Sequence, residues 1–450
     1  MTPTDTPAGG PTAGSAATPA EDPAARPAAT VGGGGRTTIE KILGRAASSS
    51  GLRAGDLAVC EIDRVVLIDI QFRSFNGWVR PLRIADPDRV AIIFDHAVPA
   101  PSIADANAGT EARAFAAQFG IEQLYDIGSH GICHQVIAEQ GLGRPGETLV
   151  CADSHTCSAG AFNCAARGLG TAEVLHVLCT GASWAIVPET IRYDLHGTLP
   201  DGVAAKDVFL HLAGTYGSAE NRAIEFAGPG VAGLPLAERR VLATQGAELL
   251  ADYTLFPCDD LLVDELAARG VHDVDPCWSD DDAAFADRRR VDLDGMEPHV
   301  GLPGRVLGNT APVSSVGDVA VDQLFIGSCA NGQLDDLAVA AAILDGRRVA
   351  PGTRLIVTPA SQQVHLDAVR RGYVETLLAA GAVVTNAACG ACFGYDLGVL
   401  GDGEVCVTSS TRNFTGRMGS PLASIYMASS ATVAASAVTG RLTDPREVAR

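Results

Sequence analysis

Several features that mark familiar classes of protein are missing from this 450-residue sequence. It contains no uninterrupted apolar run of about 18 residues, so we expect no membrane-spanning helix. The best candidate, residues 174–187, is interrupted by His176, Thr180, Gly181 and Ser183. The N-terminal segment contains acidic residues and lacks the apolar stretch of a secretion signal, which argues against export.

Positive charge is also scarce. The chain has 33 lysine and arginine residues against 53 aspartate and glutamate residues, which gives a formal net charge of −20. Such a surface repels phosphate backbones, and no cluster of basic residues is evident, so we expect no nucleic-acid partner. A small anionic substrate is still compatible with this charge, because a few local arginines decide whether it binds.

The 12 cysteines do not form the dense framework of a small secreted domain. They are spread along the chain, and most of them lie within apolar runs. This distribution favours a reducing compartment, which we take to be the cytoplasm, and it favours metal or redox chemistry.

Residues 1–36 have little to bury, because Ala, Pro, Gly and Thr dominate them; we predict a disordered tail. From Thr37 onward, strand-like and helical runs alternate, as is typical of a largely parallel sheet in an α/β fold. The predicted strands are residues 90–94, 149–152, 191–195, 223–226, 323–326, 382–385 and 405–408. The predicted helices are residues 38–43, 111–119, 172–179, 206–213, 236–250 and 431–440. Residues 268–316 are rich in Asp, Gly and Pro and are predicted to form a surface connection.

Reactive side chains repeatedly follow a predicted strand. These side chains are Asp95, His96, Asp153, Ser154, His155, Cys329, Cys389, Cys392, Arg412 and Arg417. Open α/β sheets bind their ligands at the carboxyl ends of the strands. We therefore expect a common cleft built from these loops.

Three cysteines stand out within this group. Cys389 and Cys392 form a Cys-x-x-Cys pair with small residues between the thiols, and Cys329 follows another predicted strand. Three thiolates suit a cluster of soft metal ions. For isolated cysteines, buried structural thiols or a zinc site are the simpler interpretations, and no fourth cysteine ligand is evident.

The other candidates also have simpler interpretations when each is taken alone. An Asp-His pair such as Asp95-His96 after a strand is more often a turn or a cap. Residues 153–156 are a plausible helix N-cap, although a helix N-terminus also favours an anion. Two arginines in an acidic protein are by default partners in surface salt bridges.

Taken together, the motifs resemble the aconitase superfamily, and in particular its 3-isopropylmalate dehydratase large subunits. The matching segments are residues 94–96, 131–135, 153–156, 224–230, 327–331, 389–392 and 412–417. They follow the family's order from about residue 37 to the C-terminus. The resemblance implies three α/β/α domains with mostly parallel sheets around a cluster cleft, which we place at residues 37–190, 191–316 and 317–450.

The resemblance also implies a reaction and a cofactor. The reaction is the dehydration and rehydration of a 2-hydroxy di- or tricarboxylic acid, most similar to that of 3-isopropylmalate dehydratase in leucine biosynthesis. The cofactor is a [4Fe-4S] cluster with one open iron site, held by Cys329, Cys389 and Cys392. The implied catalytic residues are Asp95, His96, His134, Asp153, His155 and Glu225. The implied substrate-binding residues are Ser154, Asn331, Arg412 and Arg417.

Four departures from the family pattern leave the substrate open. They are Ala330, Thr411 and the altered segments 68–72 and 243–246. A homoaconitase- or aconitase-like enzyme, a dehydratase for a malate analogue, and an inactive metal-binding interaction subunit remain alternatives.

Because the chain ends soon after the predicted helix at 431–440, we expect a separate small subunit to supply the swivelling domain of the family.

Overall fold

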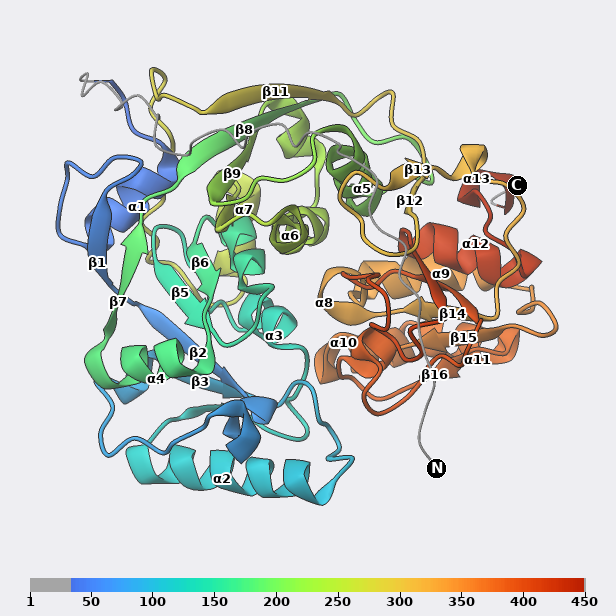
Figure 1. Ribbon diagram of the computed structural model, residues 1–450, viewed down its shortest axis with the longest axis horizontal. Coiled ribbons are helices and arrows are strands. Elements are labelled where there is room, and N and C mark those ends of the chain that lie inside the picture. The colour runs from blue at the N-terminus through green and yellow to red at the C-terminus, as the bar shows by residue number, and fades with distance from the viewer. Residues whose placement is uncertain (1–33, 449–450) are drawn as a thin grey trace, which may run out of the picture. The chain divides into compact units, whose positions relative to one another are not determined.

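The computed structural model describes residues 34–448, and the folded unit begins at Gly35 (Figure 1). Most of the predicted tail, residues 1–33, lies outside the described residues. The end of that predicted tail belongs to the fold: the backbone N–H of Arg36 donates to Asp280 at 2.8 Å, and its guanidinium donates to the carbonyl of Ser50 at 2.7 Å. The folded unit therefore starts slightly earlier than predicted.

The first sheet has five parallel strands in the order β4-β3-β2-β5-β6. These strands are β2 (Arg64–Ile68), β3 (Val90–Ile93), β4 (Gln123–Tyr125), β5 (Thr148–Cys151) and β6 (Ala165–Gly168). Helices α2 (Ile103–Phe119) and α4 (Thr171–Thr180) pack on one face, and α3 (Cys133–Glu139) packs on the other. Helices on both faces explain why the strands are continuously apolar rather than alternating.

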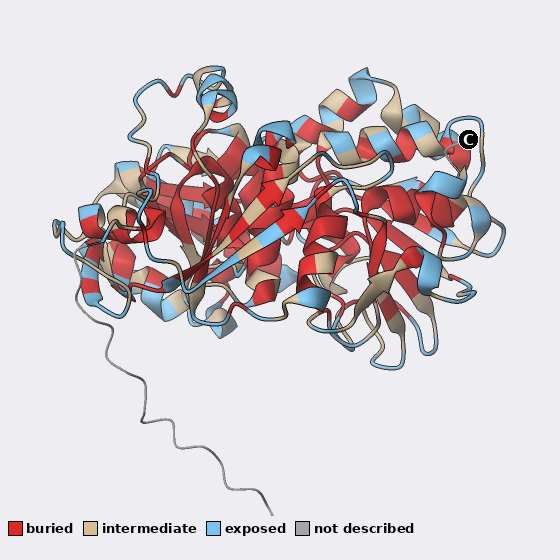
Figure 2. Ribbon diagram, turned by 90° about the horizontal axis from the view of Figure 1, so that it is seen from above, coloured by how far each residue is buried: buried red, intermediate tan, exposed pale blue. Residues whose placement is uncertain are grey.

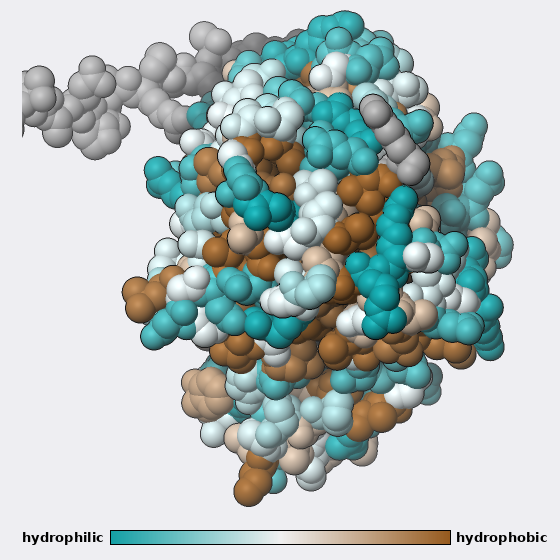
Figure 3. Space-filling view, turned by 90° about the vertical axis from the view of Figure 1, so that its right-hand side faces the viewer, coloured by the Kyte–Doolittle hydropathy of each residue, from teal (hydrophilic) through white to brown (hydrophobic). Residues whose placement is uncertain are grey.

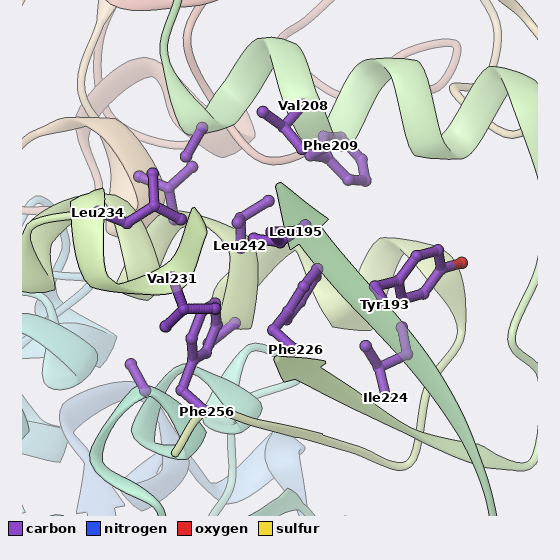
Figure 4. Packing of buried hydrophobic residues seen from close by; sticks show 14 of the residues in the cluster. Tyr193, Leu195, Val208, Phe209, Ile224, Phe226, Val231, Leu234, Leu242 and Phe256 are labelled. Carbon is purple, nitrogen blue, oxygen red and sulfur yellow. The ribbon is translucent and has the colours of Figure 1, made fainter. Parts of the chain in front are cut away.

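The second sheet has four parallel strands in the order β10-β9-β8-β11. Its elements are β8 (Glu189–His196), α5 (Ala205–Thr215), β9 (Arg222–Ala227), α6 (Leu236–Gln245), β10 (Tyr253–Leu255), α7 (Asp260–Ala267) and β11 (Asp287–Asp292). Tyr193, Phe226 and Phe256 stack beneath Val208 and Phe209 of α5 in its core (Figure 4). This packing fixes α5, whose first turn faces the site described below.

The third sheet has seven strands in the order β13-β12-β18-β17-β14-β15-β16. Its strands are β12 (His299–Gly301), β13 (Thr310–Pro312), β14 (Gln323–Ile326), β15 (Arg354–Val357), β16 (Val383–Val384), β17 (Val405–Thr408) and β18 (Ser424–Met427). Its helices are α8 (Ser328–Asn331), α9 (Leu334–Leu344), α10 (Gln362–Arg370), α11 (Tyr373–Ala380), α12 (Ser430–Thr439) and α13 (Pro445–Val448). Only β12 runs against the direction of the other six strands. β11, β12 and β13 all come from the stretch predicted to be a surface connection. That part of the prediction is wrong, because β12 and β13 have only three residues each and β11 is mostly charged, so none of them shows a run of apolar residues.

A small antiparallel sheet, β1 (Leu57–Glu61) with β7 (Ala182–Ile186), and helix α1 (Thr38–Ala46) complete the folded unit. Buried residues occupy the strands and the inner faces of the helices (Figure 2). On the face drawn at the right of Figure 1, hydrophilic and hydrophobic residues are interspersed (Figure 3). Within residues 34–448, no helix is both long enough and apolar enough to cross a bilayer. The predicted α/β class with mostly parallel sheets is confirmed.

Candidate active site

The three candidate cysteine ligands lie buried in two turns of the third sheet. Cys329 lies in α8 directly after β14, and the short 3-10 turn Gly390–Phe393 that follows β16 is capped by Cys389 and contains Cys392. Gly390 adopts φ +57°, and a Cβ there would lie 2.6 Å from Thr358 Oγ1, so only glycine fits between the two thiols. The predicted placement of both turns after strands is correct.

The three sulfurs lie close enough to influence one another. Burial raises the pKa of Cys329 and of Cys389 well above the ordinary value, and nearby aspartates and the other thiols raise it further. Their mutual repulsion as thiolates means that a positive group is needed to hold them together in the ionised form.

The three thiols do not all lie close enough together to share a single zinc ion. Thiolates bound to one zinc at roughly 2.3 Å have sulfurs only about 4 Å apart. Among residues 34–448, the one group of three or more potential ligands whose atoms lie within 4.8 Å of one another is Asp95, His96 and Cys389. Cys329, Cys389 and Cys392 therefore do not all lie within 4.8 Å of one another, which is wider than one zinc ion held by all three would allow.

Asp95 and His96 follow β3 and face this centre. Asp95 accepts the backbone N–H of Cys133 at 2.9 Å, and its other oxygen lies 3.2 Å from Cys389 Sγ and 3.3 Å from His96 Nδ1. Asp69 accepts the backbone N–H of His96 at 3.0 Å, which fixes the strand end. Burial alone would lower the pKa of His96, but the carboxylates around it outweigh burial and raise that pKa.

A second chain of polar contacts crosses the site. His134 Nε2 lies 2.7 Å from Asp153 Oδ1, which also accepts the backbone N–H of His155 at 2.8 Å. His155 Nε2 lies 3.0 Å from Glu248, and Arg412 Nε donates to the same Glu248 oxygen at 2.7 Å. These five side chains come from all three larger sheets, so the site exists only in the folded chain.

The contacts among these side chains set the protonation of Asp153 and His155. Burial alone would raise the pKa of Asp153, but its bonds to His134 and His155 hold that pKa well below the ordinary value. Burial would likewise lower the pKa of His155, and the bonds to Asp153 and Glu248 raise it instead. The arrangement therefore keeps Asp153 ionised and favours a proton on His155.

The other predicted substrate-binding residues, Arg417, Asn331 and Ser154, each have different surroundings. Arg417 Nε donates to the carbonyl of Cys392 at 3.0 Å, so this arginine lies against the cysteine turn. Asn331 donates to Asp336 at 3.0 Å, while its buried Oδ1 has no hydrogen-bond partner. Ser154 is exposed between Asp153 and His155.

Glu225 is not part of this group. Its carboxylate accepts from Arg192 at 3.4 Å and from Ser279 at 2.5 Å, away from the residues above. The glutamate that joins the site is Glu248, in the turn after α6, which the sequence analysis did not single out. The only feature of the sequence that pointed to Glu248 was its position two residues beyond segment 243–246, which departs from the family pattern.

A model of the aconitase family (aconitate hydratase) matches residues 89–314 and 305–440. The chain belongs to the aconitase family. It is 58% identical over 414 residues to the 3-isopropylmalate dehydratase large subunit of Mycolicibacterium smegmatis, which covers 92% of this chain and 98% of that protein. It is 40% identical to the large subunit 1 of the same enzyme in Methanopyrus kandleri, over 92% of this chain and 99% of that protein. It is also 42% identical to a probable methanogen homoaconitase large subunit of Methanosarcina mazei, over 81% and 93% of the two chains.

The predicted family is thus confirmed. Membership of the aconitase family implies an iron–sulfur cluster, and the site fits one. Three buried thiols offer soft ligands that do not all lie within 4.8 Å of one another, and the buried Asn331 Oδ1 without a hydrogen-bond partner leaves a polar atom for a bound group.

Proposed function

We propose that this chain is the iron–sulfur large subunit of a hydro-lyase that isomerises 3-isopropylmalate by dehydration and rehydration. The observation that carries the proposal is the convergence of three buried thiols with two carboxylate–histidine groups at one set of strand ends. The likeness to dehydratase large subunits over nearly their whole length supports the choice of reaction.

In this proposal Cys329, Cys389 and Cys392 hold a [4Fe-4S] cluster that keeps one iron open. When bound, such a cluster supplies a Lewis acid for a hydroxyl and a carboxylate of the substrate. All 12 cysteines are free thiols, so these three are available as ligands. Reduced thiols also suit the cytoplasm, which we infer as the compartment, with leucine biosynthesis as the role.

The chain's own residues supply proton transfer. Asp95 and the other carboxylates around His96 raise its pKa, which favours the protonated ring that can give a proton to the departing hydroxide. Asp153 orients His134 through a 2.7 Å contact to Nε2 and lies 3.7 Å from Nδ1 of His155, whose other ring nitrogen faces Glu248, so carboxylates lie beside both nitrogens of His155.

Arginines bind the substrate's carboxylates. Glu248 accepts a hydrogen bond from Nε of Arg412 and thereby sets the plane of the Arg412 guanidinium group. Arg417, with its guanidinium 5.9 Å from the ring centre of Phe393, provides the second positive charge beside the cysteine turn. Asn331 and Ser154 complete the proposed set of polar contacts.

The proposed partner is a separate small subunit, because the named relatives are large subunits. The test is anaerobic co-purification with a 3-isopropylmalate dehydratase small subunit, followed by NMR of the products. We expect 3-isopropylmalate to be converted by the pair and not by this chain alone. Turnover by this chain without a second polypeptide would contradict the proposed partner.

The second candidate is a homoaconitase, which the homoaconitase relatives favour. Ala330 beside Cys329 and Thr411 beside Arg412 are the positions where the pocket departs from the family pattern. Conversion of homoaconitate in preference to 3-isopropylmalate in the same assay would select this candidate. Conversion of neither acid by the reconstituted pair would contradict both.

A further inference from the structure

The chain's two lysines are in opposite environments. Lysine and arginine together number 33, and only Lys41 and Lys206 are lysines. Lys41 lies at the surface, where it pairs with Asp280 at 2.5 Å. Lys206, in the first turn of α5, is fully buried next to the site.

Lys206 donates its hydrogen bonds to backbone carbonyls. Its Nζ lies 3.1 Å from the carbonyl oxygen of Ser409 and 2.9 Å from that of Ser410. Within residues 34–448, no carboxylate forms an ion pair with it. Burial accordingly lowers the pKa of Lys206 to about 8. A buried cation with neutral partners is costly, so its contacts need an explanation.

The two carbonyls form the base of the turn that carries Arg412. Ser409 and Ser410 follow β17 directly, and Ser410 Oγ donates to the carbonyl of Arg412 at 3.1 Å. Arg412 then reaches Glu248 at 2.7 Å. The position of this arginine therefore depends on how the strand end at Ser409 and Ser410 is held.

The same strand end also holds the turn of Cys329. Ser409 Oγ accepts the backbone N–H of Gly327 at 3.1 Å and lies 3.4 Å from the carbonyl oxygen of Asn331. These two residues lie on either side of Ser328, Cys329 and Ala330. Movement of Ser409 would therefore displace a proposed cluster ligand as well as Arg412.

Helix α5 is a rigid support for the lysine. Val208 and Phe209 are fixed in the core of the second sheet (Figure 4). Asp207 accepts the backbone N–H groups of Ala204 and His299, each at 2.9 Å. The ammonium group is therefore presented from an element that cannot shift easily.

We propose that Lys206 is a positioning residue that fixes Arg412 and the Cys329 turn in register with one another. This inference rests on the proposed function for its kinetic consequences. Lysine suits the role because a compact ammonium carries three donors, two of which reach the carbonyls of Ser409 and Ser410.

The kinetic test uses the two-subunit holoenzyme with 3-isopropylmalate. Lys206→Met keeps most of the stem and removes the donors, and Lys41→Met is the matched control. We expect Lys206→Met to raise KM about tenfold or more with a smaller effect on kcat, and Lys41→Met to change neither. In an Arg412→Lys background the effect on KM should shrink to about threefold or less, because the same contact is already impaired. An unchanged KM, or effects that simply multiply, would overturn the proposal.

A second readout needs no turnover. In hydrogen-exchange mass spectrometry of the isolated chain, Lys206→Met should speed exchange in residues 406–413 and 327–331 and leave α2 unchanged. Unchanged exchange in both segments would also overturn the proposal. If the holoenzyme fails to convert 3-isopropylmalate, the proposed function fails, while the exchange result still decides the role of Lys206.

A second variant covers the case in which Lys206→Met does not fold. Ser410→Ala leaves the lysine in place and removes only the bond from Ser410 Oγ to the carbonyl of Arg412. We expect it to raise KM and to leave exchange outside residues 406–413 unchanged. A KM equal to that of the wild type would count against the proposal.

Discussion

At the scale of single residues, Glu248 is the side chain that connects His155 with Arg412. One of its oxygens contacts Nε2 of His155 and accepts a hydrogen bond from Nε of Arg412, and these two residues belong to different sheets. Burial alone would raise the pKa of Glu248, but these two partners outweigh burial and lower it. Glu248 is therefore ionised at neutral pH, and its charge stabilises a proton on His155.

We expect Glu248→Gln to lower kcat/KM by roughly 10- to 100-fold, because charge-assisted hydrogen bonds of about 1.5–3 kcal/mol are weakened. The measurement is steady-state kinetics of the reconstituted two-subunit enzyme. Glu225→Gln is the matched control, and it should stay within about twofold of the wild type. A large loss with Glu225→Gln and none with Glu248→Gln would reverse the assignment of the two glutamates.

The sequence could not distinguish these glutamates, for a physical reason. Glu225 lies on β9 directly opposite Arg192 of β8, and that cross-strand pairing takes up its carboxylate. Strand register depends on contacts between distant segments. Glu248 lies in an irregular turn, where no periodicity shows which way a side chain points.

At the scale of elements, the strands that lead into the site were predictable. Short apolar runs located β3, β5, β14 and β17, and the reactive residues follow each of them as predicted. Helix boundaries were less accurate: α2 begins at Ile103 rather than at residue 111. Its first turn is set by Ser102, whose hydroxyl caps Asp105, and an alanine-rich stretch gave no apolar period to show it.

One ion pair fixes α6, the helix that precedes Glu248, to α7. The fully buried Arg239 of α6 donates to both oxygens of Asp259 at 2.8 and 2.6 Å, and Asp259 also caps α7 through Leu262. Burial alone would raise the pKa of Asp259, but the bonds from Arg239 outweigh it and lower that pKa. The guanidinium is fully buried, whereas 32% of the Asp259 side chain is exposed, so solvent screens the pair from one side.

We expect Asp259→Asn to lower the free energy of unfolding by about 1–2 kcal/mol at neutral pH, since the cap is kept but the buried guanidinium loses a counter-charge that solvent partly screens. Urea denaturation measures this. Because the folded pKa is depressed, the contribution is complete above about pH 4 and is lost as the pH falls below it. The difference between variant and wild type should therefore shrink in acid.

The exposed neighbour Asp260 gives the control for this prediction. Asp260→Asn should change stability by no more than about 0.5 kcal/mol. Equal effects of the two variants, or a difference for Asp259→Asn that grows as the pH falls, would contradict the role given to the ion pair.

At the scale of the whole molecule, the sequence predicted which segments meet but not how they are held. The buried Arg240 of α6 donates to Gln135 of α3 at 2.7 Å and to Gln333 after α8 at 2.6 Å, so it ties elements of all three larger sheets together. Such long-range contacts leave no local pattern in the sequence. Each larger sheet lies mainly within one of the three proposed domains, although β12 and β13 join the third sheet from the proposed second domain.

The central claim is that Cys329, Cys389 and Cys392 together hold a polynuclear iron–sulfur centre. Its most direct test is iron and sulfide quantitation after anaerobic reconstitution, with Cys60→Ser as the control at a buried thiol of another core. We predict roughly four irons per chain with broad visible absorbance in the wild type and control, and a marked loss in Cys329→Ser. One zinc or no metal under strict anaerobiosis, or full iron content in Cys329→Ser, would contradict the account.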